Sequence, residues 1–159
     1  MENCGGCYPV FRGINAINID AKGRLAVPAR YRASLSERAH GQLIVTIDTD
    51  EHCLLLYPLP FWEEIEQKVQ ALPALNPAVR RIQRLLIGHA TEVELDANGR
   101  ILLPGLLREY AQLEKEVMLV GQGNKFEIWS KSVWTTSCEG WLDSDGSNEL
   151  PPELMTISL

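Results

Sequence analysis

The sequence predicts a mainly β protein of the α+β class, built from two tandem copies of one small unit. Three observations support this: one segment recurs along the chain, short strand-like segments flank each copy of it, and helical spacing is confined to a few stretches. The chain has 159 residues, of which 45% are hydrophobic and 23% charged, as expected for one globular domain or two small ones sharing a core.

The repeat has two parts that occur in the same order in each copy. Asp20–Pro28 (DAKGRLAVP) returns as Asp96–Pro104 (DANGRILLP), 76 residues later. Leu54–Trp62 is matched by Phe126–Trp134, 72 residues later, so the second copy has a shorter connection. Two ordered matches of this length indicate duplication of a structural unit.

Each copy predicts the same succession of elements. A strand leads into an Asp-Ala-x-Gly turn, in which Asp accepts backbone hydrogen bonds and Gly allows a positive φ. A short strand follows, then a helix whose first turn tolerates proline, then a β-hairpin. The predicted strands are 14–19, 25–27, 43–47 and 53–57 in the first copy, and 91–95, 101–103, 117–121 and 126–129 in the second.

Helices are expected at fewer places. Tyr31 and Leu35 should face the core from the helix after Pro28. Between the copies, apolar residues recur at helical spacing from Phe61 to Leu72. A second connecting helix should start at the Asn76-Pro77 cap, have Val79, Ile82 and Leu86 along its apolar face, and end at Gly88 in a left-handed cap.

We therefore expect five segments along the chain. They are a flexible N-terminal extension (1–10), a first repeat (14–58), a helical connection (60–88), a second repeat (90–134) and an acidic C-terminal tail (138–159). Two such copies can cover each other around a pseudo-two-fold axis and close one barrel, which also hides strand edges that a single copy leaves exposed. That arrangement brings the two Asp-x-x-Gly-Arg turns to related positions.

Charge is distributed unevenly along the chain. The net charge is −6, yet the tail holds five acidic residues and no lysine or arginine, whereas 12–38 holds six basic and two acidic residues. A basic patch on an acidic protein is compatible with a polyanionic partner, although a mixed, solvated surface explains the same counts. Arg80, Arg81 and Arg84 on the second connecting helix are best explained by a solvated or subunit-contacting face.

The sequence gives little support for an enzyme, a metal site or a cofactor. Cys4 and Cys7 have C-x-x-C spacing without a second ligand pair, so we expect reduced thiols. The acidic 48–52 segment resembles a metal site superficially, but it falls in a predicted hairpin loop, where such residues are common. We see neither a nucleophile with a spaced base nor a phosphate-binding glycine loop.

The paired turns are the best candidate for function. Arg24 and Arg100 could each donate two hydrogen bonds to guanine O6 and N7 in the DNA major groove, and Lys22 could bind phosphate. Asn98 replaces Lys22 in the second copy, so the turns need not contribute equally. A purely structural role, in which Asp20 and Asp96 pair with these arginines to hold the turns rigid, is equally consistent with the residues alone.

The pattern resembles the MraZ family, bacterial proteins encoded at the head of the division and cell-wall gene cluster. The resemblance covers about Phe11 to Trp134, and the following segments carry it: Phe11-Arg12-Gly13, Asp20–Arg24, Pro28, Tyr31-Arg32, Leu54–Pro58, Arg80-Arg81, Asp96–Arg100 and Lys125–Trp129. Family members usually begin Met-Phe-Arg-Gly, whereas here Val10 precedes Phe11. We therefore expect 1–9 to be a dispensable extension with the true start at Val10.

The resemblance implies a fold and a function. The fold is a tandem pair of swapped-hairpin SpoVT-AbrB-like β-barrel units with short helices. The function is transcriptional regulation, usually repression, by a ring-shaped homo-oligomer that binds double-stranded DNA at direct repeats in the promoter of its own gene cluster. The implied motif residues are Asp20, Arg24, Asp96 and Arg100, and our candidate DNA-binding set adds Lys22, Arg30 and Arg32.

Two further expectations follow, and one alternative remains. We expect a cytoplasmic, nucleoid-associated protein with no cofactor, no small-molecule substrate and no membrane contact. The alternative is an oligomeric interaction or scaffold module without specific DNA binding, in which the arginines contact neighbouring subunits. In that alternative Trp62, Trp129, Trp134 and Trp141 are surface anchors, although burial in the core is the commoner reason for tryptophan.

Overall fold

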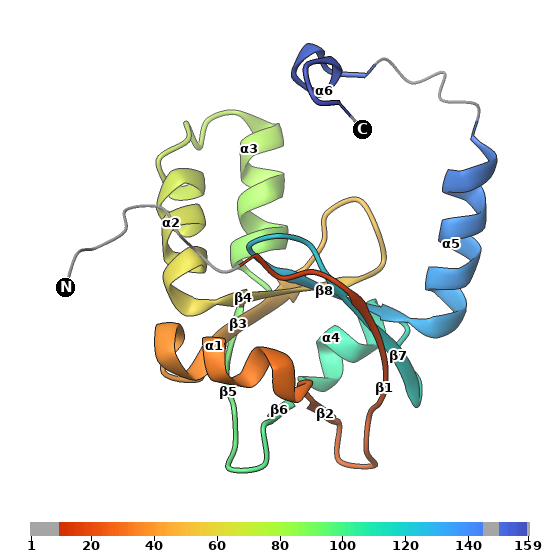
Figure 1. The fold of residues 1–159 in the computed structure, drawn as a ribbon. Coiled ribbons are helices and arrows are strands. Elements are labelled where there is room, and N and C mark those ends of the chain that lie inside the picture. Colours follow the sequence, from red (N-terminus) through yellow and green to blue (C-terminus); the bar gives the residue numbers. More distant parts are fainter. Residues whose placement is uncertain (1–9, 145–149, 159) are drawn as a thin grey trace.

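The computed structural model describes residues 10–144 and 150–158, and its fold is of the α+β class with mostly antiparallel strands (Figure 1). The expected extension at 1–9 lies outside the described residues. The first copy and its connection comprise β1 (Ile14–Asn18), β2 (Arg24–Ala26), α1 (Ala29–Ala39), β3 (Gln42–Ile47), β4 (Leu54–Pro58), α2 (Leu59–Gln70), α3 (Pro77–Ile82) and the π-helical turn η1 (Gln83–Ile87).

The second copy repeats this order with a shorter first strand and a shorter first helix. It comprises β5 (Thr91–Glu94), β6 (Arg100–Leu102), α4 (Gly105–Tyr110), β7 (Glu116–Gly121), β8 (Phe126–Ser130) and α5 (Lys131–Asp143), and a short α6 (Pro152–Met155) lies beyond. Helix α1 has 11 residues and α4 only 6, which explains part of the reduced offset between the copies. The expected start of the acidic tail, residue 138, falls inside α5.

The two copies exchange strands. A six-stranded sheet has the order β1-β7-β8-β4-β3-β5, so β1 pairs with a strand of the second copy and β5 with a strand of the first. A separate two-stranded ribbon pairs β2 with β6, with Leu25 opposite Ile101. In the large sheet Leu55 lies opposite Glu127. Because these pairs occupy equivalent positions in the two copies, a pseudo-two-fold axis passes through both of them.

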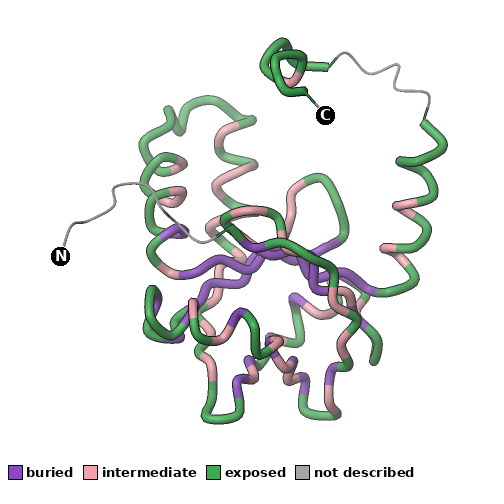
Figure 2. The backbone as a smooth tube through the Cα atoms, viewed as in Figure 1, coloured by how far each residue is buried: buried purple, intermediate pink, exposed green. Residues whose placement is uncertain are grey.

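The core lies between the large sheet and the ribbon. Leu25, Ile101, Leu56 and Ile128 are fully buried in one cluster that combines residues of both copies. Tyr31 and Leu35 face this core from α1, as the helical spacing predicts. Figure 2 shows the sheet as a buried layer and the tips of both turns as exposed. Neither copy can therefore bury its apolar face without the other.

The connecting helices follow the sequence expectation except at one end. The side chain of Asn76 caps α3 by accepting a hydrogen bond from the Ala78 backbone N–H. Gly88 does not form the expected left-handed cap, because its φ is −62°. Five-residue π-helical bonding closes the helix there instead, and a Cβ at Gly88 would lie only 2.1 Å from the Arg84 carbonyl oxygen. That expectation was wrong, and close backbone contact explains the glycine.

Candidate nucleic-acid interface

Both Asp-x-x-Gly-Arg segments form the same tight turn. Oδ1 of Asp20 accepts hydrogen bonds from the backbone N–H groups of Lys22 and Arg24, each at 2.9 Å. Oδ1 of Asp96 accepts the equivalent bonds from Asn98 and Arg100 at 2.8 and 2.9 Å. Such side-chain acceptors explain why aspartate begins each motif. The carboxylates thus fix the path of the chain into β2 and β6.

The β2–β6 ribbon brings the two turns together on one side of the molecule (Figure 1). The register places Arg24 opposite Leu102 and Ala26 opposite Arg100. Because side chains alternate across a strand, these four residues share the outer face, opposite the buried pair at the centre of the ribbon. The repeat only suggested that the two turns lie at related positions, and the structure places them side by side.

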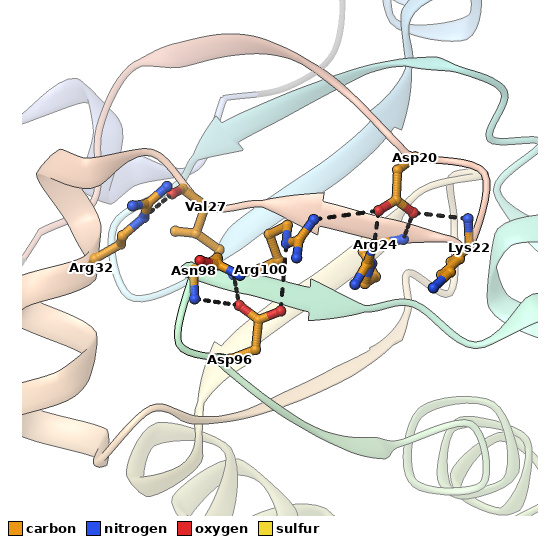
Figure 3. Close-up of polar contacts among 8 residues, drawn as sticks. All are labelled: Asp20, Lys22, Arg24, Val27, Arg32, Asp96, Asn98 and Arg100. Atoms are coloured by element: carbon orange, nitrogen blue, oxygen red, sulfur yellow. Dashed lines mark hydrogen bonds and ion pairs between the residues drawn. The ribbon is translucent and has the colours of Figure 1, made fainter.

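The two arginines are held by carboxylates but are not buried (Figure 3). Nε of Arg24 donates to Oδ2 of Asp20 at 2.7 Å. Nε of Arg100 lies 3.5 Å from Oδ2 of Asp96, and its Nη1 lies 3.8 Å from Oδ2 of Asp20. The arginine side chains are 31% and 30% exposed. Among the described residues no acceptor is recorded for the Nη atoms of Arg24, so they can bind a partner.

The carboxylates remain ionised well below neutral pH. The backbone N–H of Arg24, more than any other group, lowers the pKa of Asp20 from 3.8 to about 2, and the Arg24 side chain adds to the effect. The backbone N–H of Arg100 likewise lowers the pKa of Asp96. The ionised carboxylate of Asp20 strengthens its hydrogen bond to the Arg24 guanidinium and keeps that arginine in place before a ligand arrives, whereas Arg100 makes only longer ion-pair contacts with Asp96 and Asp20.

The remaining predicted residues fall into two groups. Lys22 lies exposed at the tip of the first turn, on the same side as Arg24. Arg30 contacts β1 instead: its Nη2 donates to Oδ1 of Asn15 at 2.8 Å, and its guanidinium lies 4.7 Å from the Tyr31 ring centroid. Within the described part of the chain, these contacts do not join Arg30 to either turn. Lys22 therefore fits the interface better than Arg30.

Arg32 braces the turn of the other copy. Its Nε donates to the Val27 carbonyl oxygen at 2.6 Å, and a Cβ at Gly99 would lie 2.2 Å from that nitrogen. Gly99 has a φ of +72°, so glycine is required there by both conformation and space. Arg32 thus packs against the second turn at Gly99 and supports it.

Arg108 is a functional candidate that we did not select from the sequence. Its Nε donates to the Leu103 carbonyl oxygen at 3.2 Å, and its guanidinium carbon would lie 2.8 Å from a Cβ at Gly23. Arg108 is the repeat counterpart of Arg32, so the repeat itself contained the signal. The two arginines form a reciprocal brace in which each copy supports the turn of the other.

A second cluster of polar groups has different chemistry. Single ligand atoms of Asp48, Cys53 and Glu127 lie within 4.8 Å of one another. Burial raises the pKa of the Cys53 thiol and that of the Glu127 carboxyl. Nε1 of Trp129 donates to Oε1 of Glu127 at 3.1 Å. Because burial opposes the deprotonated forms that metal binding and nucleophilic attack require, this cluster is better explained as part of the core.

The described helices include none with the length and apolar character needed to cross a membrane.

The fold and the turns define a duplicated protein that presents paired arginines on a β-ribbon, and comparison with known proteins places it in a family. A family model described as MraZ protein matches residues 10–85 and again 86–148. The chain therefore belongs to the MraZ family, and the resemblance seen in the sequence is confirmed.

Close relatives carry one name. A protein of Coxiella burnetii (strain Dugway 5J108-111) is 61% identical over 152 residues, covering 94% of this chain and 100% of its own length. One from Legionella pneumophila (strain Corby) is 59% identical with the same coverage, and one from Hydrogenovibrio crunogenus is 54% identical over 149 residues, covering 94% of this chain and 98% of its own. All three are named transcriptional regulator MraZ, which identifies a family of regulators and not of enzymes.

Proposed function

We propose that this chain is a sequence-specific DNA-binding transcriptional regulator that inserts the β2–β6 ribbon into the major groove. One observation carries the proposal: Arg24 and Arg100 share the outer face of the ribbon, with their backbones fixed by Asp20 and Asp96. The major groove of B-DNA admits a two-stranded β-ribbon, and arginine paired with guanine is the commonest base-specific contact there.

The proposed target is a set of short direct repeats containing guanine, in the promoter of the chain's own division and cell-wall gene cluster, where binding represses transcription. Arg24 and Arg100 read bases, while Lys22 and, at the edges of the site, Arg30 and Arg32 bind phosphate. Diagonal neighbours on a ribbon lie about 7–8 Å apart, so the two arginines can reach guanines roughly two base-pair steps apart. This binding gives the protein a cytoplasmic, nucleoid-associated location.

The proposed assembly is a ring of identical subunits, each a pair of swapped-hairpin SpoVT-AbrB-like units. The strand exchange between copies supports the swapped-hairpin assignment. Leu75 and Leu142 are 90% and 85% exposed, which supplies apolar surface for subunit contacts away from the ribbon. A head-to-tail ring presents its ribbons in one orientation, as direct repeats require, and several weak contacts then add by avidity.

The alternative function, an oligomeric scaffold without specific DNA binding, rests on the apolar surface around α5. Trp129, Trp134 and Trp141 make edge contacts with one another, with ring centroids 5.4–5.8 Å apart. Trp129 is buried, but Trp141 is 49% exposed and could anchor a partner. This alternative predicts no promoter preference and little dependence of binding on salt.

Footprinting on the DNA directly upstream of the gene tests the proposal. The wild-type chain should protect a set of evenly spaced repeats, and the double variant Arg24→Ala/Arg100→Ala should lose this protection. Lys68→Ala removes the same kind of charge from an exposed site on α2 and should leave the footprint unchanged. Equal binding of wild type and double variant to the promoter, or no preference for it over unrelated DNA, would support the scaffold instead. Light scattering on the wild type measures the proposed ring.

A further inference from the structure

The outer face of the β2–β6 ribbon contains one large apolar side chain. Leu102 is 57% exposed and lies directly opposite Arg24 in the strand register. Its equivalent in the first copy is Ala26, which lies opposite Arg100. A single exposed leucine is ordinary on a protein surface. Its position here is informative, because it lies on the face that we assign to DNA and beside an arginine that we assign to guanine.

Cross-strand neighbours act together on a ribbon face. Side chains directly opposite one another have Cβ atoms about 4.5–5.5 Å apart, and base pairs are stacked about 3.4 Å apart. A DNA duplex that contacts the guanidinium of Arg24 therefore also contacts Leu102, at a base pair one or two steps away. The only apolar group that a base pair presents in the major groove is the 5-methyl group of thymine.

We propose that Leu102 contacts the 5-methyl group of a thymine beside the guanine bound by Arg24. The Arg24 half of the ribbon then reads guanine and thymine together, whereas the Arg100 half, with only Ala26 beside it, reads mainly guanine. The proposal rests on the DNA-binding function proposed above and adds a specificity-determining residue to it. It also explains why the copies differ at this position: leucine reaches a methyl group that alanine contacts less fully.

Uracil in place of thymine tests this idea, because it removes only the methyl group. The promoter fragment is prepared once with dTTP and once with dUTP, and each is titrated with the full chain at one salt concentration. Loss of a buried methyl group should weaken wild-type binding about fourfold per engaged site. Leu102→Ala should bind the thymine fragment more weakly than wild type and should no longer distinguish the two fragments.

The control is Leu72→Ala, which truncates another exposed leucine in the loop between α2 and α3, on the opposite side of the molecule from the turns. This variant should keep the wild-type ratio of thymine to uracil affinity. Thermal unfolding of both variants checks the fold, which an exposed truncation should barely change.

Two outcomes separate this proposal from the function on which it rests. If wild type prefers its promoter but binds both fragments equally, or if Leu102→Ala discriminates as wild type does, the methyl contact is overturned and the DNA-binding function stands. If wild type shows no preference for the promoter over unrelated DNA, the DNA-binding function itself fails, and the methyl contact fails with it.

Discussion

Asp20 holds the guanidinium of Arg24 through a 2.7 Å hydrogen bond from Nε to Oδ2, and its other oxygen accepts from the Arg24 backbone N–H. Backbone and side chain of one arginine are thus fixed by one carboxylate. Among the described residues the two terminal nitrogens of Arg24 have no acceptor, so they can donate in parallel to a base. Less side-chain entropy is then lost on binding, because the arginine is already ordered in the free protein.

We predict that Arg24→Ala weakens promoter binding more than Arg100→Ala. Arg24 is the better ordered of the two, since the Nε of Arg100 lies 3.5 Å from its carboxylate oxygen. Lys22 also adds a positive charge only to the first turn. Loss of a bidentate base contact should cost about 1–3 kcal/mol per engaged site for Arg24, and less for Arg100. Fluorescence anisotropy with a labelled promoter fragment measures both.

Lys68→Ala serves as the matched control for lost charge, because Lys68 is exposed on α2. Its promoter affinity should stay within about twofold of wild type. The ranking is wrong if Arg24→Ala and Arg100→Ala bind the promoter with equal affinity.

We predict that Asp20→Asn lowers specificity rather than overall binding. Asparagine can still accept the two backbone hydrogen bonds, but its amide N–H₂ faces the Nε donor of Arg24. The ratio of promoter affinity to unrelated-DNA affinity should fall about five- to tenfold, the low end for a charge-assisted bond at a partly exposed site. Affinity for unrelated DNA should rise, since one negative charge is lost. A variant that keeps the wild-type ratio contradicts the positioning role.

The same substitution has a signature in acid. The pKa of Asp20 is lowered from 3.8 to about 2 in the folded chain. Between these values the unfolded state binds more protons than the folded state, so the stabilisation from Asp20 is complete above pH 3.8 and is lost as the pH falls through about 2. The stability difference between wild type and Asp20→Asn should therefore shrink over this range. Urea unfolding at a series of pH values measures it, and a constant difference would show that Asp20 is not responsible.

We predict that Gly99→Ala destabilises the protein more than Gly123→Ala. Both glycines have positive φ, +72° and +83°, so both substitutions carry backbone strain of about 1–2 kcal/mol. At Gly99 the new Cβ would contact Arg32, whereas no atom of the described residues, apart from the glycine's chain neighbours, lies within 4 Å of a Cβ at Gly123. The difference in unfolding free energy between the two variants measures how much the packing of Arg32 against Gly99 contributes to stability. Equal destabilisation would mean that Arg32 moves aside at no cost.

We predict that Glu127→Gln stabilises the protein at neutral pH. Burial raises the pKa of Glu127 above its ordinary 4.5, so the folded state binds more protons and stability falls as the pH rises through the raised pKa. Glutamine keeps the acceptor for the Trp129 N–H without the buried charge. The gain should be largest near pH 7 and disappear below pH 4.5. Glu63→Gln, at an exposed site on α2, should show no such trend.

The sequence was most informative where local chemistry repeats. The Asp-x-x-Gly-Arg motif predicts its turn because aspartate and glycine fix that conformation within a few residues. Alternation and helical spacing placed the strands and α2 within a few residues of their observed bounds. The same reasoning failed at Gly88, because the bonding of η1 depends on a backbone contact that composition does not reveal.

By itself, the sequence determined the duplication, the two turns and the arginines that they present, because these depend on residues close together along the chain. Only the tertiary structure decided that Arg24 lies opposite Leu102, that Asp20 serves both arginines, and that Arg32 and Arg108 each brace the turn of the other copy. These contacts join residues about 70 or more positions apart. Register and packing between distant segments are fixed when the two copies bury a shared core, which no local pattern specifies.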